Sequence, residues 1–252
     1  LGPETTPDPC TKLDAVSDIS PKIAARSQLL PWLQLRASYA EGFALPGGNV
    51  KYAPGAQSLS PNNIRQVEVG ARLTPLDRFD FDVVAYRVNS SNEFTAIAPG
   101  EFANFGRTRR TGIEASLSWR PVDALDLRVA YGYADSSVRQ NFNAALVGKK
   151  VTGVPDHSVT ASAFWSPIEA VKLNATYRYL GKYPVNPVNT IIAPSYDLID
   201  VGASYKLPTR APLRLYVNVE NLIDKVYAPS VNTIGFATGA PRTFRAGLQF
   251  GF

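Results

Sequence analysis

Segments of about ten residues in which apolar and polar side chains alternate recur along this chain and restrict its possible folds. Between residues 125 and 133, the odd positions hold Leu, Leu, Val, Tyr and Tyr, and the even positions hold Asp126, Arg128, Ala130 and Gly132. Successive side chains of a strand point to opposite faces, so each such segment has one apolar face and one polar face. The alternation therefore predicts a β-sheet that is apolar on one side and wet on the other.

Aromatic residues mark both ends of these segments. Trp32, Trp119 and Trp165 each lie within two residues of a proline in a short connection. At the opposite ends the segments carry tyrosine, at Tyr39, Tyr131, Tyr133, Tyr177 and Tyr179. Two aromatic rims separated by about ten residues of alternating strand are typical of an outer-membrane β-barrel. A soluble β-sandwich has no physical reason to sort Trp to one rim and Tyr to the other.

The alternation predicts about eleven strands, which we place at Ile19–Leu29, Leu33–Ala40, Ile64–Leu73, Phe79–Asn89, Thr111–Trp119, Leu125–Ala134, Ser158–Trp165, Val171–Leu180, Tyr196–Tyr205, Leu213–Asn221 and Arg242–Phe252. Short proline-containing turns alternate with long connections along the chain. The predicted long loops are Glu41–Asn63, Ser90–Arg110, Asp135–His157, Gly181–Ser195 and Leu222–Pro241. Short turns on one rim and long loops on the other fit an antiparallel transmembrane barrel wall, with the short turns in the periplasm.

Composition excludes several classes of protein. The mean hydropathy is −0.10 and no run approaches the roughly 18 apolar residues of a membrane helix. The net charge of +5 is not accompanied by the aromatic and basic motifs of a nucleic-acid binder. With Cys10 and His157 as its single cysteine and single histidine, the chain cannot assemble a zinc site or a His-based nucleophilic mechanism. We therefore expect no catalytic residue, no metal ligands and no enzymatic activity, and Cys10 is either a free thiol or paired with a cysteine outside this chain.

An odd number of strands has a topological consequence. The first and last of eleven up-and-down strands run in the same direction, whereas bacterial barrels close through an even number of antiparallel strands. Open edges in lipid leave backbone groups unsatisfied, which is costly. We therefore expect this chain to be a piece of a larger barrel. A twelfth strand within residues 1–17 is the alternative, although this stretch has three prolines and no alternation.

Several short motifs lie in order at the expected strand ends. Ser38–Pro46 (SYAEGFALP) resembles the motif S-Y-x-E-G-F-R-A-P, and Glu68–Arg72 (EVGAR) resembles E-x-G-x-K/R. Asn221–Tyr227 (NLIDKVY) is similar to N-L-F-D-K-x-Y, with Ile223 in place of Phe. Further similarities lie at Asn104–Gly106, Gly112–Glu114, Gly239–Arg242 and the terminal Phe252. Together these motifs resemble the TonB-dependent outer-membrane receptors of the siderophore-receptor type, over roughly Asp18 to Phe252.

This resemblance implies the architecture and the partners of the chain. It implies that residues 18–252 are the C-terminal half of a 22-stranded barrel in the bacterial outer membrane and that residues 1–17 are the remnant of an extracellular loop. The receptor would import a ferric siderophore or a similar scarce nutrient. The N-terminal plug, the remaining strands and the TonB box would lie outside this chain, and TonB would act through the plug. The other implied partners are outer-membrane lipid, lipopolysaccharide and, through Phe252, the barrel-assembly machinery. Nucleic acid is not expected as a partner. Iron would enter only within the chelate, so no cofactor bound by protein ligands is expected.

The ligand-capturing residues are expected in the extracellular loops. Aromatic and cationic side chains there could hold an anionic, partly aromatic chelate through charge and cation–π contacts. The candidates are Tyr52, Phe102, Phe105, Arg107, Arg109, Arg110, Lys149, Lys150, Tyr183 and Asn186. The alternative is that these cations meet lipopolysaccharide and that the tyrosines belong to the aromatic girdle.

A second set of charged residues is expected to face the lumen. It comprises Glu68, Arg72, Glu114, Arg128, Lys172, Arg178, Arg214, Glu220 and Arg245. These side chains would either contact the plug or line a solvated channel. A passive porin remains the main functional alternative, and it would be favoured if no plug accompanied the barrel.

Overall fold

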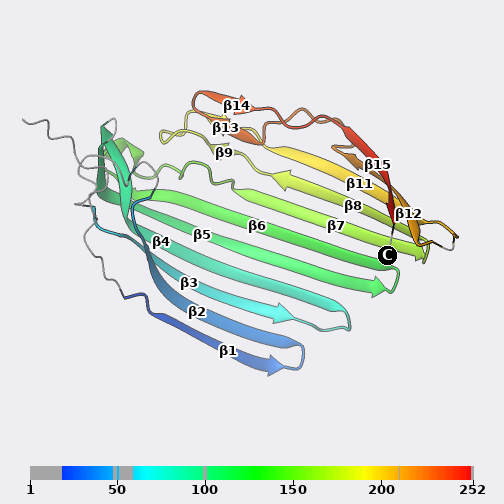
Figure 1. The fold of residues 1–252 in the computed structure, drawn as a ribbon. Coiled ribbons are helices and arrows are strands. Elements are labelled where there is room, and N and C mark those ends of the chain that lie inside the picture. The colour runs from blue at the N-terminus through cyan, green and yellow to red at the C-terminus, as the bar shows by residue number, and fades with distance from the viewer. Residues whose placement is uncertain (1–18, 48–49, 51–58, 99–100, 210, 251–252) are drawn as a thin grey trace, which may run out of the picture.

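The computed structural model describes residues 19–47, 50, 59–98, 101–209 and 211–250, most of which form one curved sheet (Figure 1). The sheet has eleven strands in chain order, each antiparallel to its neighbour. The strands are β1 (Lys22–Leu30), β2 (Leu33–Ala44), β3 (Asn62–Leu73), β4 (Phe79–Ala98), β5 (Glu101–Val122), β6 (Leu125–Gln140), β7 (His157–Ile168), β8 (Val171–Leu180), β11 (Tyr196–Lys206), β12 (Leu213–Glu220) and β15 (Thr243–Phe250). The described loops contain a short 3₁₀ turn, η2 (Ala144–Leu146), and two small hairpins, β9 (Tyr183–Pro184) with β10 (Ile192–Ala193) and β13 (Ser230–Asn232) with β14 (Gly235–Ala237).

Each of the eleven predicted strands is present, and the main difference lies in strand length. The predicted loop Ser90–Arg110 is mostly strand, because β4 continues to Ala98 and β5 already begins at Glu101. Alternation of apolar residues reports contact of one face with lipid, and it fades where a strand projects beyond the lipid. Residues 90–93 of β4 carry no apolar side chain, so the alternating pattern is interrupted before the strand ends.

Two predicted turn prolines also lie inside strands. β5 runs through Pro121 and β7 runs through Pro167. The pairing register shifts at both places, between Trp119 and Val122 and between Trp165 and Ile168. A proline cannot donate a backbone hydrogen bond, and a bulge is one of the few positions in a sheet that tolerates it.

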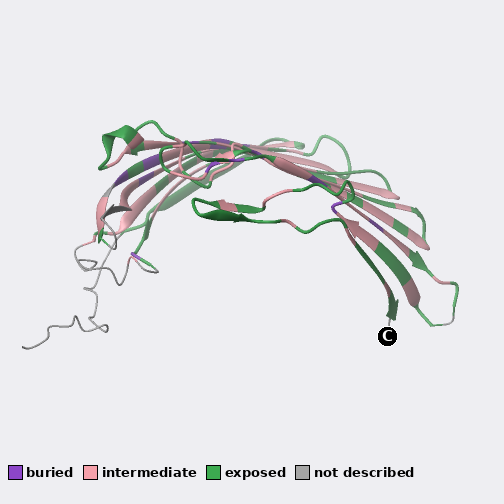
Figure 2. Cartoon of the chain, turned by 90° about the horizontal axis from the view of Figure 1, so that it is seen from above, coloured by how far each residue is buried: buried purple, intermediate pink, exposed green. Residues whose placement is uncertain are grey.

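The sheet is a single curved layer without a packed interior (Figure 2). Among the described hydrophobic residues only Ala193 and Leu198 are buried. Large apolar side chains on one face are exposed instead, as with Val69 at 59% and Phe244 at 69%. Apolar area on this scale is not left in water by a soluble domain. Within the described part of the chain, no helix has the length and apolar character needed to cross a membrane.

The strand register separates an apolar face from a polar face. Directly paired residues share a face of the sheet. One row joins Val69, Ala85, Ile113 and Tyr133, and a row on the opposite face includes Arg72, Asp82, Ser116, Ala130 and Thr160. The hollows of the sheet are lined by the polar row, so we call the polar side the concave face and the apolar side the convex face.

The two margins of the sheet differ in the length of their connections. The connections at the short-turn edge are residues 31–32, 74–78, 123–124, 169–170 and 207–212. At this edge, the ammonium of Lys206 at the end of β11 contacts the Glu169 carboxylate at 2.9 Å and lowers the pKa of that carboxyl. The long-loop edge carries the other connections. β1 and β15 both run toward the short-turn edge and form the two open sides of the described sheet (Figure 1).

Candidate ligand-binding vestibule

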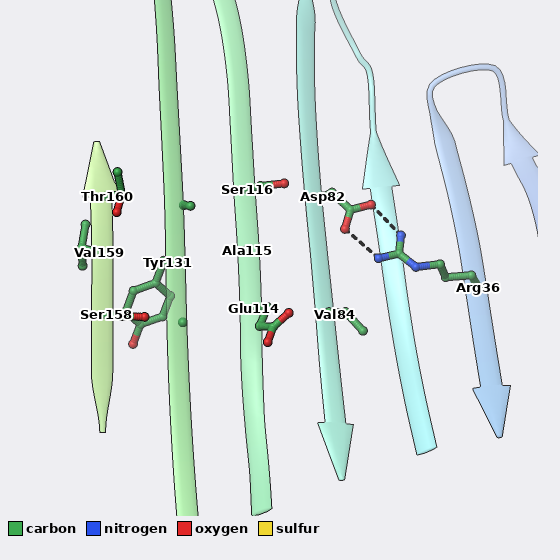
Figure 3. Close-up of a pocket in the computed structure, with 12 residues that line it drawn as sticks. Arg36, Asp82, Val84, Glu114, Ala115, Ser116, Tyr131, Ser158, Val159 and Thr160 are labelled. Carbon is green, nitrogen blue, oxygen red and sulfur yellow. Dashed lines mark hydrogen bonds and ion pairs between the residues drawn. The ribbon is translucent and has the colours of Figure 1, made fainter. Parts of the chain in front are cut away.

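Charged side chains on the concave face are arranged as ion pairs between strands. Arg36 on β2 reaches Asp82 on β4, with Nη1–Oδ2 and Nη2–Oδ1 distances of 2.5 and 2.6 Å. Figure 3 shows this pair beside Glu114 on the adjacent strand β5. Arg178 and Asp200 form a similar contact at 2.5 Å further along the sheet. The concave face is therefore polar, and many of its charges are neutralised in ion pairs. Such a surface suits a lumen that is filled by water or by protein.

The nine charges predicted to face the lumen all lie on the concave face. The strand register places Glu68, Arg72, Glu114, Arg128, Lys172, Arg178, Arg214, Glu220 and Arg245 there. Most of them are paired, as Arg245 is with Glu220 at 2.9 Å. Glu114 and Lys172 form no hydrogen bond or ion pair with the described residues. The pattern analysis missed Arg36 and Asp82, although their alternation with apolar neighbours placed them on the same face.

A cavity of about 750 Å³ lies at the long-loop edge, where β4, β5 and β6 meet the loop that follows β6. We call it the vestibule. Its lining residues are Glu93, Thr108, Val138, Gln140, Asn141, Phe142, Asn143, Leu146, Lys150, Val151, Thr152 and Pro187. Its size and its mixture of apolar, amide and charged groups are typical of a small-molecule site.

Of the ten predicted ligand residues, Lys150 lies in the wall of the vestibule. Its ammonium forms an ion pair with Asp156. Its backbone is held by Asn189, which accepts a hydrogen bond from the Lys150 N–H at 2.7 Å and donates one to the Lys150 carbonyl at 3.1 Å. Gly153 N–H also donates to the Pro184 carbonyl at 2.9 Å. Two loops from different hairpins are thus joined by hydrogen bonds, which position the Lys150 backbone. The ion pair with Asp156 positions its ammonium group.

The predicted β5 candidates lie on a strand and not in a loop, and they divide between its two faces. Arg110 pairs with Val88 and Ser136 on the concave face, and Arg109 pairs with Asn89 and therefore lies on the convex face. Arg107 shares the convex face with Arg109 because it is two residues away along the strand. A ligand in the vestibule can be approached by Arg110, whereas Arg107 and Arg109 point away from it.

The remaining candidates are scattered along the long-loop edge. Phe102 is half-buried near the start of β5, and Lys149 is exposed beside η2. Tyr183 begins β9, and the Asn186 amide organises its own loop by accepting hydrogen bonds from the N–H groups of Thr190 and Ile191 at 2.9 and 3.0 Å. Tyr52 and the Phe105 side chain lie outside the described part of the structure. The ligand-binding role of these residues stays a prediction.

Sequence reasoning overlooked two kinds of vestibule residue. Phe142 is an aromatic residue of the predicted loop Asp135–His157, so the rule that selected Phe102 could also have selected it. Glu93 and Thr108 were overlooked because their segment was expected to be an irregular loop. In the structure they come from the paired strands β4 and β5, and their side chains are hydrogen-bonded to each other.

The described residues contain no group of three or more His, Cys, Asp or Glu side chains arranged to hold a metal ion. His157 lies on the convex face, where its Nδ1 atom is 3.0 Å from the Tyr131 hydroxyl. This contact places the histidine in the tyrosine rim. Cys10 and Phe252 lie outside the described residues.

The sequence is similar to known receptor barrels. Residues 4–222 match the family described as TonB dependent receptor-like, beta-barrel. The metal-pseudopaline receptor CntO of Pseudomonas aeruginosa is 28% identical over 242 residues, which cover 92% of this chain and 33% of the receptor. The ferrioxamine B receptor of Salmonella typhimurium is 25% identical over 232 residues, covering 88% of this chain and 32% of that protein. The chain thus spans about a third of the length of these relatives.

Solved structures share the fold. The siderophore receptor PiuA from Acinetobacter baumannii superposes with a TM-score of 0.82 at 20% identity, over 91% of this chain and 35% of that one. The ferric-catecholate import receptor Fiu from Escherichia coli K12, in its closed form, superposes with a TM-score of 0.75 at 22% identity, over 90% of this chain and 34% of that one. The curved eleven-stranded sheet therefore corresponds to part of a complete barrel wall.

Proposed function

The chain belongs to the TonB-dependent receptor-like β-barrel family, and we propose that it forms the C-terminal part of the barrel of a receptor that imports a ferric siderophore or a similar scarce nutrient. The receptor lies in the bacterial outer membrane. The observation that carries the proposal is the single-layer sheet with an exposed apolar convex face and an ion-paired concave face. The relatives named as metal-pseudopaline and ferrioxamine B receptors support the same conclusion.

In the intact receptor, further strands would pair with the open sides of β1 and β15 and complete a barrel of 22 strands. This closure would satisfy the backbone groups that lipid cannot hydrogen-bond. An N-terminal plug would then occupy the concave face. Glu114 is suited to meet a cationic side chain of that plug, because it has no ion-pair partner among the described residues and lies beside the Arg36–Asp82 pair (Figure 3). Coupling to TonB would proceed through the plug.

The vestibule would be the first binding site of the imported chelate. Lys150 and Arg110 would attract its negative charge, and Phe142 and Phe102 would contact its apolar or aromatic parts. Iron would enter as a component of the substrate, held by the chelator and not by the protein. The relatives are receptors and not enzymes, and we assign no catalytic role to this chain.

Uptake measurements separate this proposal from a passive porin. Cells that express the intact receptor gene would be supplied with iron-55 bound to siderophores of several chemical classes, with and without a functional TonB protein. A receptor gives saturable uptake of one class that is lost without TonB. A passive channel gives uptake that rises linearly with concentration and is indifferent to TonB, and this result would refute the proposal.

A further inference from the structure

A β-bulge directs the side chain of Glu93 into the vestibule. The register of β4 and β5 shifts between Ser91 and Glu93, where Asn92 is an extra residue on β4. One extra residue reverses the alternation of faces for the residue that follows it. Glu93 pairs with Gly106 and therefore shares the concave face with Thr108, which is two residues further along β5. Without the bulge, the Glu93 side chain would lie on the convex face.

The bulge is held by hydrogen bonds from a side chain of β5. Asn92 adopts a left-handed backbone conformation with a φ of 58°, which asparagine tolerates better than most residues. The Asn104 amide donates to the carbonyls of Asn92 and Ser60, both at 2.8 Å, and its oxygen accepts from the Ser60 N–H at 2.6 Å. The bulge is thus joined to β5 and to the segment before β3, so the backbone determines the direction of the Glu93 side chain.

The Glu93 carboxylate is only partly satisfied within the described structure. Its Oε1 atom accepts a hydrogen bond from the Thr108 hydroxyl, and Thr108 is 7% exposed. Arg110 lies 3.4 Å from the Thr108 hydroxyl oxygen through Nη1. Among the described residues, neither Arg110 nor any other cation forms an ion pair with Glu93, and its Oε2 atom accepts no hydrogen bond. This second oxygen is available to a ligand in the vestibule.

The vestibule therefore presents two charged groups of opposite sign. Glu93 and Lys150 are the charged residues of its described lining, and Lys150 is already paired with Asp156. The apolar side chains of Val138 and Leu146 in the same wall lower the local dielectric, which strengthens contacts between charges. A chelate that is anionic throughout would be repelled by Glu93. A chelate whose anionic metal centre is separated from a protonated amine can satisfy both charged groups.

We propose that Glu93 determines the specificity of the vestibule by selecting ferric chelates that carry a protonated primary amine. The ammonium group would donate a charge-assisted hydrogen bond to Oε2, while the anionic metal centre faces Lys150 and Arg110. An uncharged chelator arm in the same place would leave the carboxylate desolvated and unpaired, and this penalty discriminates against it. Because Glu93 acts on the chelate that the vestibule would bind, this role rests on the proposed function.

Matched chelates test this selection on the purified intact receptor. Ferric hydroxamate, catecholate and hydroxycarboxylate chelates would each be prepared with a free terminal primary amine and with the same amine acetylated. Quenching of tryptophan fluorescence would give the Kd of each form for the wild type, Glu93→Gln, Glu93→Asp and Glu41→Gln. Glu41 is the matched control, because it lies at the same edge on the convex face, where it contacts Arg65 at 3.2 Å. The heat-modifiable barrel band would show that each variant is folded.

We expect the wild type to bind the free-amine form of at least one chelate class about tenfold more tightly than its acetylated form. Glu93→Gln should abolish this difference, whereas Glu93→Asp, which keeps the charge, and Glu41→Gln should retain it. Equal Kd values of the two forms in the wild type, or an unchanged difference in Glu93→Gln, would overturn the role of Glu93 alone. If the wild type bound none of the chelates in either form, the proposed function would fall, and the role of Glu93 with it.

Discussion

The Arg36 guanidinium pairs with the Asp82 carboxylate across an intervening strand, since Arg36 is on β2, Asp82 is on β4 and Gly70 of β3 lies between them. A Cβ atom on Gly70 would lie 3.0 Å from Cζ of Arg36 and 2.9 Å from the Val83 carbonyl oxygen. The missing side chain of Gly70 is therefore what allows the ion pair to lie flat on the concave face.

Replacing Gly70 with Ala should weaken the barrel. The added methyl group must displace the Arg36 side chain or the β4 backbone, and overpacking of this kind costs about 1–3 kcal/mol. The temperature at which the intact receptor loses its heat-modifiable band should fall. Gly42→Ala is the matched control, because its Cβ would meet no atom within 4 Å. Equal thermal stability of the two variants would contradict this role for Gly70.

Asn221 should anchor the loop that spans residues 222–241. Its side chain is 3% exposed, and it donates to the carbonyls of Lys225 and Ala240 at 2.9 and 3.1 Å. Asn221→Ala leaves these groups without their partner, at a cost of about 1–3 kcal/mol. Proteolysis of this loop in the intact receptor should accelerate. Asn232→Ala, which removes a single local hydrogen bond, should leave the rate unchanged, and unchanged proteolysis in Asn221→Ala would refute the anchor.

Removing the charge of Lys150 should weaken capture of an anionic ferric chelate. The loss of one charge-assisted contact corresponds to an increase in Kd of about tenfold. Quenching of tryptophan fluorescence in the purified receptor can measure this Kd. Salt screens the attraction between Lys150 and the anionic chelate. The difference in Kd between Lys150→Gln and the wild type should therefore shrink as the salt concentration is raised. Lys206→Gln at the short-turn edge provides the control, and an equal effect there would exclude a specific role for Lys150.

Substituting Glu114 with Gln should loosen the plug. The substitution keeps the shape of the side chain but removes the negative charge that we assign to plug contact. Planar-bilayer recordings of the intact receptor should then show a higher ion leak than the wild type. Arg87→Gln removes an exposed charge from the convex face, on the side of the sheet away from the plug, and it should leave the leak unchanged. An unaltered leak in Glu114→Gln would exclude that contact.

The strands were predictable because lipid imposes a period of two on one face of each strand. Val69 of β3 and Ile113 of β5 lie on that face. On β6, Leu127 and Val129 lie on the same face at every second position. Beyond the lipid this constraint ends, and residues 90–93 carry no apolar side chain although they form part of β4. Extended strands in water are stabilised by their pairing partner, which local sequence does not reveal.

The vestibule was less predictable than the wall. Lys150 was identified from its charge and its position in a loop, but its fixation by Asn189 joins segments that are far apart in the sequence. The separation of Arg109 from Arg110 required the strand register, because in a loop the two neighbouring side chains have no defined faces. Loop-to-loop contacts of this kind depend on tertiary structure and leave no periodic pattern.

The alternating accessibility of β3 tests the membrane-wall account most directly. Single cysteines would be placed at residues 67, 68, 69, 71 and 72 of the intact receptor, in a Cys10→Ser background, and labelled in outer membranes. We predict that positions 67, 69 and 71 react with a lipid-soluble maleimide and resist a charged one. Positions 68 and 72 should react with the charged reagent once the plug is displaced by urea. Equal reaction of both sets with the charged reagent would contradict a lipid-facing convex surface.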